Sequence, residues 1–213
     1  MIDIIEYEIE KYIEDHSTNT SKVLQQNYRE TNLTTFYPQM LSGKVQAKFL
    51  EMICRMMQPE RVLEIGTFTA YSAIAMAEGL PENAKLITIE VNEELETIIK
   101  KYIALAGMND KIELLLGDAL QIIPQLDELF DFVFIDADKE QYIDYYELSM
   151  EKLKPGGFIL IDNVLWGGKA VKGKNPDKET RGIRRFNEYV KNDKRVEQVI
   201  LSIRDGLMMV RKL

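Results

Sequence analysis

The stretch Val62-Leu63-Glu64-Ile65-Gly66-Thr67-Phe68-Thr69-Ala70-Tyr71-Ser72 decides the fold. It starts as a short apolar strand, turns through small residues after Gly66 and continues into a helical pattern. Small residues at such a turn let backbone N–H groups and the N-terminus of the helix approach a ligand closely. Tight packing of the strand on the helix explains a glycine turn equally well, so this stretch alone leaves the ligand open.

Short β-branched runs alternate with helical patterns on both sides of this stretch. We expect parallel strands at 61–65, 85–89, 111–116, 130–135 and 158–161, and helices at 72–78, 93–106, 119–126 and 141–153. A helix near 183–190 and strands at 196–202 and 206–211 follow, with Arg204-Asp205-Gly206 as a tight hairpin turn. Such alternation is typical of an α/β fold with helices on both faces of a mostly parallel sheet, here ending in an antiparallel pair.

The residues before this core have helical apolar spacing, interrupted by a turn-like stretch from Thr31 to Ser42. We interpret residues 1–58 as a helical cap of the same domain and residues 59–213 as its core. Neither an internal repeat nor an interdomain linker is visible in the 213 residues. The sequence therefore predicts a single domain.

The composition excludes several classes of protein. It is 46% hydrophobic and 29% charged, and it contains no apolar run of the ~18 residues that a membrane span needs. The N-terminus does not resemble a secretory signal, so we expect a cytoplasmic protein without a membrane partner. Cys54 is the single cysteine; it excludes an internal disulfide and sits in an apolar stretch that predicts a buried thiol.

Charge is distributed unevenly along the chain. The formal net charge of −8 argues against a general nucleic-acid-binding surface. Residues 169–185, however, contain seven lysines and arginines against two acids, a local net charge of +5. This basic segment is either a solvated loop and helix face or a patch for an anionic substrate.

Polar residues follow the predicted strands at the edge where open α/β sheets bind ligands. Glu90 comes 26 residues after Glu64, where a carboxylate can accept the hydroxyls of an adenosine ribose. The run Gly117-Asp118-Ala119 places a short acid where an adenine amino group can bind, although Asp118 can equally be a helix N-cap. These strand ends outline an adenosine pocket without distinguishing a nicotinamide cofactor from S-adenosylmethionine.

Two later strands distinguish the two cofactors. The fourth strand runs into Asp136, and the fifth runs into Asp162 and Asn163. Neighbouring strands lie about 4.8 Å apart, so the two carboxylates would converge and repel unless a cation lay between them. Two carboxylates and an amide suit Mg²⁺, and a nicotinamide enzyme has no need of them.

The stretches 64–72, 134–139 and 161–168, in this order and spacing, resemble the catechol and caffeoyl-CoA O-methyltransferase family from about Phe36 to the C-terminus. The resemblance implies a class I, Rossmann-like S-adenosylmethionine-dependent methyltransferase with a seven-stranded sheet. It also implies a metal site at Asp136, Asp162 and Asn163, catalysis by Lys139 with Asp136, and a homodimer. Implied cofactor contacts are Met40, Glu64, Gly66, Ser72, Glu90, Gly117, Asp118, Ala119 and Asp136.

The sequence departs from the family pattern at two places. Ala70 replaces the glycine usual in the cofactor loop, and Ser42-Gly43 stands where relatives often carry an acid before glycine. The first change makes close backbone approach harder. The second leaves the substrate-side entrance undefined.

We therefore expect an O-methyltransferase that uses S-adenosylmethionine and Mg²⁺ to methylate a metal-bound hydroxyl. The first choice of acceptor is a small aromatic diol or an acyl-CoA phenol. The alternative is a 5-hydroxyuridine at the wobble position of a tRNA anticodon, since the basic segment suits the phosphates of either CoA or tRNA. A non-catalytic nucleotide-binding protein on the same fold is a third reading, against which the intact metal set argues.

Overall fold

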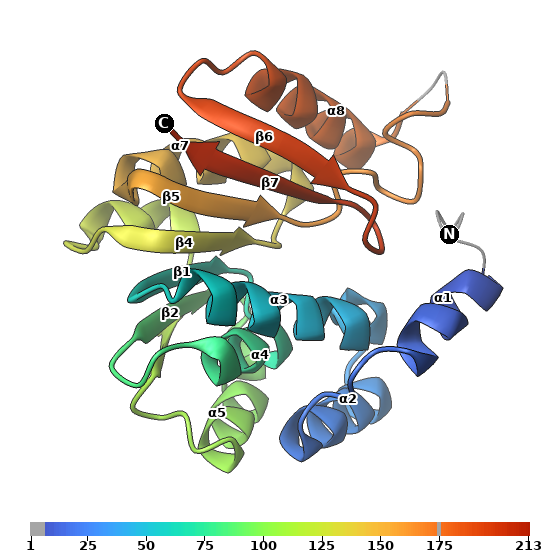
Figure 1. Cartoon of the computed structure of the whole chain (residues 1–213), viewed down its shortest axis with the longest axis vertical. Helices are drawn as coiled ribbons and strands as arrows, with labels where there is room; N and C mark the ends of the chain where they lie inside the picture. The colour runs from blue at the N-terminus through green and yellow to red at the C-terminus, as the bar shows by residue number, and fades with distance from the viewer. Residues whose placement is uncertain (1–6, 174–175) are drawn as a thin grey trace. The chain divides into compact units, whose positions relative to one another are not determined.

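The computed structural model describes residues 7–173 and 176–213 (Figure 1). Lys174, one member of the basic segment, lies outside the described residues. The seven strands form one sheet with the order β3-β2-β1-β4-β5-β7-β6. By its contacts the chain divides into an N-terminal unit, Lys11–Asp118, and a C-terminal unit, Ala119–Leu213 with the start of α1. The predicted boundary between cap and core, at residues 58 and 59, lies inside the N-terminal unit.

The N-terminal unit is built on three parallel strands, β1 (Arg61–Ile65), β2 (Lys85–Glu90) and β3 (Ile112–Leu116). Their registers run Ile65 opposite Ile89 and Ile89 opposite Leu115. The connecting helices are α4 (Tyr71–Gly79) and α5 (Glu96–Leu105), the latter preceded by the 3₁₀ turn η2 (Glu93–Leu95). All of α4 except Glu78 is buried, as expected for a helix that is apolar on every face.

Among the described residues, four helical elements precede β1 and, apart from the start of α1, belong to this unit. They are α1 (Tyr7–Asp15), α2 (Lys22–Thr34), the 3₁₀ turn η1 (Pro38–Met40) and α3 (Gly43–Met57). The turn predicted from Thr31 was placed too early, because α2 continues to Thr34. Its inward side carries Asn27 and Thr31 beside Leu24, so apolar spacing alone could not reveal it. α3 packs along α4 and buries Cys54 completely, as predicted; this burial raises the pKa of the thiol to about 12.

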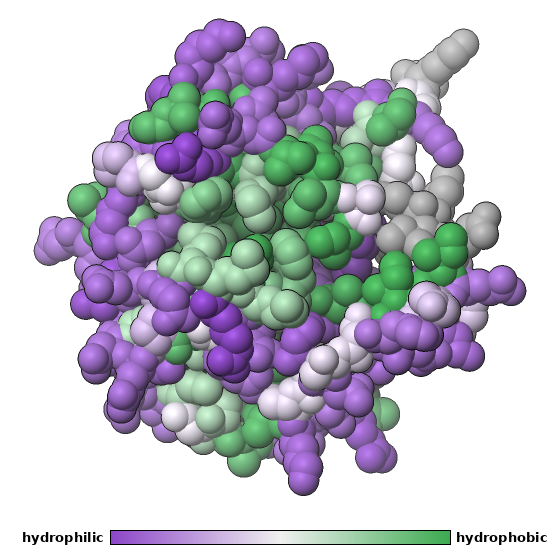
Figure 2. All heavy atoms as spheres, in the orientation of Figure 1, coloured by the Kyte–Doolittle hydropathy of each residue, from purple (hydrophilic) through white to green (hydrophobic). Residues whose placement is uncertain are grey.

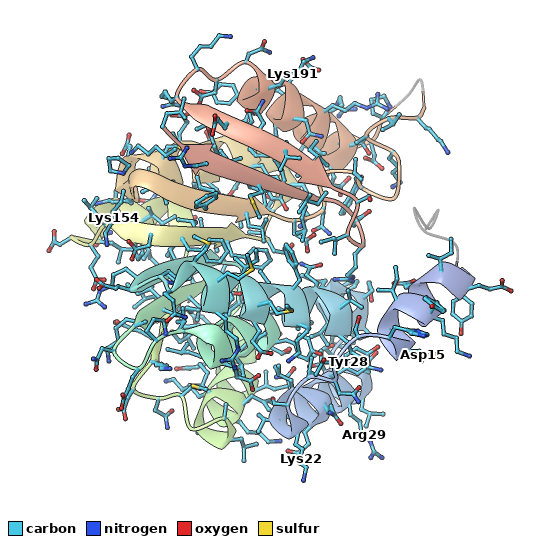
Figure 3. All side chains as sticks on the ribbon, viewed as in Figure 1. Asp15, Lys22, Tyr28, Arg29, Lys154 and Lys191 are labelled. Atoms are coloured by element: carbon cyan, nitrogen blue, oxygen red, sulfur yellow. The ribbon has the colours of Figure 1, made fainter. Side chains whose placement is uncertain are left out.

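The C-terminal unit contains the parallel pair β4 (Phe130–Ile135) and β5 (Leu153–Ile161) and the antiparallel hairpin β6 (Val196–Leu201) and β7 (Leu207–Lys212). Figure 1 shows β4, β5, β7 and β6 side by side in this order. The predicted hairpin is confirmed, whereas β5 begins five residues earlier than predicted. That early part holds Lys154, labelled in Figure 3, which forms a 2.7 Å ion pair with Asp131 of β4.

The remaining elements of this unit are short turns and two longer helices. They are α6 (Ala119–Ile122), η3 (Ile123–Gln125), η4 (Lys139–Gln141), α7 (Tyr142–Lys152) and α8 (Lys178–Lys191). α8 starts five residues before its predicted start because Asp177 caps it, accepting a hydrogen bond from Thr180 N at 2.8 Å. Hydrophilic residues dominate the top of Figure 2, where Figure 1 places α8. No helix among the described residues is long and apolar enough to span a membrane.

Candidate functional site

The loop after β1 has the backbone conformation of a close-approach turn. Gly66, Phe68 and Ala70 have φ values of +97°, +50° and +65°. Non-glycine residues rarely adopt this left-handed region, so the surroundings must hold Phe68 and Ala70 in place. Ala70 has no polar side chain with which to cap α4. The first N–H groups of this helix are therefore suited to bind an acceptor group of a ligand.

Helix α2 holds this loop through a buried polar network that the sequence did not reveal. Asn27 Nδ2 donates to the carbonyl oxygen of Thr69 at 2.7 Å, and the hydroxyls of Thr31 and Thr69 lie 3.0 Å apart. All three side chains are fully buried. The ring of Tyr28, labelled in Figure 3, also lies near that of Tyr71, with 6.3 Å between centroids. The position of the loop thus depends on contacts from residues about 40 positions away in the sequence.

Glu90 ends β2 and faces the same loop. Its Oε2 accepts a hydrogen bond from Phe68 N at 2.7 Å, and its Oε1 accepts one from Asn92 N at 2.9 Å. A carboxylate has about four acceptor sites, so these two bonds leave capacity for hydroxyl donors of a ligand. The structure therefore places the predicted ribose acceptor at the cofactor loop and already oriented by two backbone amides.

Other predicted cofactor residues differ in how accessible they are. Glu64 is fully buried, and its Oε2 accepts from the hydroxyl of Thr88 at 2.5 Å. Ser72 is buried in the first turn of α4, whereas the side chain of Met40 is 57% exposed at the end of η1. Glu64 thus links β1 to β2 through a buried hydrogen bond, which its position in the sequence could not show.

The third strand end has the geometry expected of a backbone turn. Gly117 has a φ of +136°, and its N–H donates to the carbonyl oxygen of Glu90 at 2.8 Å. Asp118 follows with an exposed side chain, and Ala119 begins α6. The backbones of Gly117 and Glu90 are therefore hydrogen-bonded to each other. Asp118, the acid predicted to bind the adenine, consequently follows a residue that neighbours Glu90, the acid predicted to bind the ribose.

The predicted metal ligands lie at neighbouring strand ends in the C-terminal unit. Ile135 and Ile161 are the last paired residues of β4 and β5, and Asp162 N donates to the carbonyl oxygen of Ile135 at 3.0 Å. Asp136 and Asp162 therefore leave adjacent strands at the same level, as predicted. Asn163 follows with a φ of +60°, and its N–H donates to Asp162 Oδ1 at 2.7 Å.

Lys139 joins this group through an ion pair with Asp136, in which Nζ and Oδ1 are 2.9 Å apart. Burial lowers the pKa of this ammonium group, whereas the Asp136 carboxylate and the Tyr142 hydroxyl raise it, and together these two neighbours outweigh burial. Lys139 is accordingly a cation in this structure. In this protonated form Lys139 can stabilise a negative charge. It can accept a proton only after losing its own, which requires that the Asp136 carboxylate be neutralised by another cation.

Tyr142 is a site residue that the sequence analysis missed. Its ring is almost fully buried, and its hydroxyl donates to the carbonyl oxygen of Asp162 at 3.0 Å. Lys139 Nζ lies 5.3 Å from the ring centroid. Burial raises the pKa of the Tyr142 hydroxyl, and the nearby charges of Asp136 and Asp162 act in the same direction. The available signal was its spacing, three residues after Lys139 at the start of a helix.

Much of the basic segment is used to hold its own loop. Arg184 donates to the carbonyl oxygens of Lys169, Ala170 and Lys172 at 2.7, 3.0 and 2.6 Å, which ties residues 169–173 to α8. Lys169 pairs with Asp177 at 3.0 Å, and Lys178 pairs with Glu140 at 2.6 Å. A surplus of positive charge in the sequence therefore overstates the charge that this segment offers to a ligand.

The donor chemistry of the C-terminal unit fits a hard divalent cation. No group of three or more His, Cys, Asp and Glu side chains suited to a metal occurs among the described residues. A site here must therefore combine the two carboxylates with the Asn163 amide, an oxygen-only set of the kind Mg²⁺ and Ca²⁺ use together with water. Asp162 is 1% exposed, and a carboxylate so deeply buried needs compensating positive charge or hydrogen bonds.

Comparison with known proteins agrees with this geometry. The O-methyltransferase family model matches residues 14–213. The chain is 36% identical to a catechol O-methyltransferase of Niastella koreensis over 162 residues, 74% of this chain and 73% of the relative. It is 34% identical to a caffeoyl-CoA O-methyltransferase of Eucalyptus globulus over 187 residues, 82% and 75% of the two chains.

Solved structures show the same likeness over nearly the whole chain. An O-methyltransferase from Bacillus cereus in complex with SAH matches with a TM-score of 0.89 at 30% identity, covering 97% of each chain. An O-methyltransferase of tomaymycin synthesis from Streptomyces achromogenes, in complex with SAM, matches with a TM-score of 0.86 at 30% identity, covering 98% of this chain and 99% of the other. The chain therefore belongs to the family of S-adenosylmethionine-dependent O-methyltransferases.

Proposed function

We propose that this O-methyltransferase methylates a hydroxyl of a small aromatic diol or an acyl-CoA phenol, with the help of a divalent cation, for which Mg²⁺ is our choice. The observation that carries the proposal is the pair of adjacent strand-end carboxylates, Asp136 and Asp162, followed directly by the Asn163 amide. The relatives support a small-molecule acceptor, because they are catechol and caffeoyl-CoA O-methyltransferases.

The N-terminal unit supplies most of the residues proposed to hold S-adenosylmethionine. Glu90 is suited to accept the ribose hydroxyls, the N–H groups in the first turn of α4 are suited to bind an acceptor group of the ligand, and Asp118 is the proposed partner of the adenine amino group. The structural relatives in complex with SAH and SAM support this cofactor. When bound, the cofactor supplies an electrophilic methyl group on a sulfonium.

The C-terminal unit supplies the residues proposed to act on the acceptor. Asp136, Asp162 and Asn163 would hold the cation, which lowers the pKa of an acceptor hydroxyl. The ammonium group of Lys139 would stabilise the oxygen as its proton leaves. Lys139 itself takes that proton only when its 2.9 Å pairing with Asp136 no longer holds its pKa above the ordinary value.

The reaction balances without a covalent enzyme intermediate. The acceptor oxygen loses a proton and forms an O–C bond to the methyl group, while the S–C bond of the sulfonium breaks and its electron pair stays on sulfur. SAH, the methyl ether and one proton are the products. The chain's main contribution is alignment of the two reactants, which can supply several kcal/mol of a barrier.

A radiometric assay tests the proposal. Labelled S-adenosylmethionine is incubated with catechol, caffeoyl-CoA or tRNA containing 5-hydroxyuridine, each with Mg²⁺ and with excess chelator. We expect methylation of a phenolic acceptor that disappears in chelator. Methylation of the tRNA alone would show that the acceptor is a nucleic acid and not a small phenol. The internal contacts of the basic segment argue against that outcome.

The homodimer remains a proposal, which light scattering on the purified protein will test.

A further inference from the structure

The loop that follows β5 begins with a residue in an unfavourable backbone conformation. Asn163, a proposed metal ligand, has a φ of +60°, and Trp166 has a φ of +49°. Residues other than glycine rarely adopt this left-handed region, which persists only where the surroundings impose it. The contacts that fix this loop therefore also fix the ligand that it carries.

Val164, the residue directly after this ligand, is held at both of its backbone polar groups. Its N–H donates to the carbonyl oxygen of Gly206, in the turn between β6 and β7, at 3.1 Å. Its carbonyl oxygen accepts a hydrogen bond from Asn187 Nδ2 of α8 at 2.8 Å. Val164 itself is fully buried. The hairpin and α8 thus fix the two peptide groups that flank Val164.

Other contacts support later parts of the loop. Leu165 N donates to the carbonyl oxygen of Asp205 at 3.0 Å. Arg184 of α8 binds backbone carbonyls within residues 169–172. Of the two contacts made to the residue directly after the proposed ligand, only that of Asn187 comes from a side chain. A substitution can therefore remove it and leave the backbone contacts in place.

Asn187 makes this contact at an energetic cost. Its side-chain oxygen, Oδ1, is buried and has no hydrogen-bond partner among the described residues. A buried acceptor without a donor is unfavourable. A leucine of similar size would avoid that cost, but it could not donate to Val164. An asparagine here is therefore better explained by what its nitrogen holds than by a gain in stability.

We propose that Asn187 is a positioning residue of the metal site, which keeps Asn163 in place by holding the Val164 carbonyl. The inference rests on the proposed function, because it takes Asn163 as a metal ligand. Residues that support a ligand typically contribute about 10- to 100-fold to metal affinity. Asn187 acts through one intervening residue, so we expect the lower end of that range, about tenfold.

The test uses Mn²⁺ as the probe, with the free ion quantified by electron paramagnetic resonance. The Asn187→Leu side chain has a similar size but no donor, and we expect its Mn²⁺ dissociation constant to rise about tenfold. The melting temperature should stay within about 4 °C of wild type, because one unpaired buried acceptor, Asn187 Oδ1, is exchanged for another, the Val164 carbonyl. SAH binding, measured by calorimetry, should stay within about twofold, since most proposed cofactor contacts belong to the N-terminal unit.

Trp166 reports on the loop without any metal. It is the single tryptophan of the chain and lies two residues after Val164, so the indole signal in a heteronuclear NMR spectrum comes from this loop alone. We expect this signal to shift or broaden in Asn187→Leu. An unchanged indole signal would overturn the inference, because the loop would then keep its conformation without Asn187.

Asn192→Leu is the matched control. Asn192 is the C-cap of the same helix, and its Nδ2 also donates to a backbone carbonyl, that of Glu188, at 2.7 Å. That carbonyl belongs to α8 and not to the loop, so Mn²⁺ affinity and the Trp166 signal should equal those of wild type. Equal Mn²⁺ affinity in Asn187→Leu and wild type would overturn the inference, as would equal losses in both variants. Failure of wild type itself to bind Mn²⁺ would instead refute the proposed metal site, and the inference with it.

A measurement on the wild-type chain covers the case in which Asn187→Leu does not fold. Hydrogen exchange at Nδ2 is followed by NMR for Asn187 and for the exposed Asn192, with and without saturating Mg²⁺. If the Asn187 contact raises metal affinity, bound metal must stabilise that contact by the same factor. We therefore expect Mg²⁺ to slow the exchange of Asn187 about tenfold and to leave that of Asn192 unchanged. Exchange of Asn187 that does not respond to Mg²⁺, in a protein that binds Mn²⁺, would overturn the inference.

Discussion

Replacing Asn27 by leucine tests whether α2 holds the cofactor loop. The substitution keeps a side chain of similar size but removes the 2.7 Å hydrogen bond to the Thr69 carbonyl and the acceptor for the Thr69 hydroxyl at 3.2 Å. Each buried group left unpaired costs about 1–3 kcal/mol. The hydroxyls of Thr31 and Thr69 can still pair at 3.0 Å, so the carbonyl bears most of the loss. We expect the free energy of unfolding to fall by about 2–4 kcal/mol.

Urea denaturation measures this change, and Asn32→Leu is its control. Asn32 lies on the same helix and donates to the Tyr28 carbonyl at 2.8 Å, but it is exposed. Water can replace its hydrogen bond, so we expect a loss below about 0.5 kcal/mol. Equal losses in the two variants would refute the reasoning, because burial of the network would then have no energetic consequence.

The same variant should weaken cofactor binding. A loop with left-handed residues at Phe68 and Ala70 that has lost its anchor samples other conformations and binds less often in the competent one. We expect the dissociation constant of SAH to rise about tenfold, which corresponds to about 1.4 kcal/mol. Calorimetry at a temperature where the variant is fully folded measures this effect. A destabilised variant with unchanged SAH affinity would make the network a purely structural feature.

Four further outcomes follow from the described contacts. Glu90→Ala should weaken SAH binding at least tenfold in calorimetry while leaving the melting temperature within a few degrees, and unchanged affinity would remove Glu90 from the cofactor site. Asp162→Ala should abolish Mn²⁺ binding in a resonance titration; retained binding would contradict the ligand set. Arg195 holds the pKa of Asp193 at about 2, below its ordinary 3.8, so this carboxylate stabilises the fold above about pH 4 and loses that effect as the pH falls through 2. Acid titration of Asp193→Asn should show less loss of stability across this window, and an identical profile would exclude the pair as its source. Reversing Lys172 and Arg181 to glutamate should leave catechol turnover intact, whereas loss of turnover would give the segment a structural or substrate-binding role.

The strands could be predicted because short runs of apolar, β-branched and aromatic residues favour extended backbone locally. The runs 61–65 and 130–135 are mostly apolar and rich in β-branched or aromatic residues, and β1 and β4 have these same bounds in the structure. The start of β5 was missed since Pro155 and two glycines interrupt its early part. α2 was only partly predicted because its buried side carries Asn27 and Thr31, which stabilise it through long-range hydrogen bonds.

The candidate site was predictable where it depends on strand ends and unpredictable where distant segments meet. Asp136 and Asp162 follow consecutive strands of a parallel sheet, so their closeness is a consequence of topology. Asp205 contacts residues about 40 positions earlier, and no periodicity encodes that contact. The charge state of Lys139 also required the structure, since burial and Asp136 shift its pKa in opposite directions and the sequence does not show which prevails.

Methyl transfer from labelled S-adenosylmethionine to catechol, measured with Mg²⁺ and with excess chelator, tests the central claim most directly. Asp136, Asp162 and Asn163 are proposed to hold the cation that makes the acceptor hydroxyl acidic, so we expect turnover with Mg²⁺ and none in chelator. Restoring Mg²⁺ should restore the rate, while Asp162→Ala should stay inactive under both conditions. Undiminished methylation in chelator by the wild-type chain would contradict the divalent-cation mechanism.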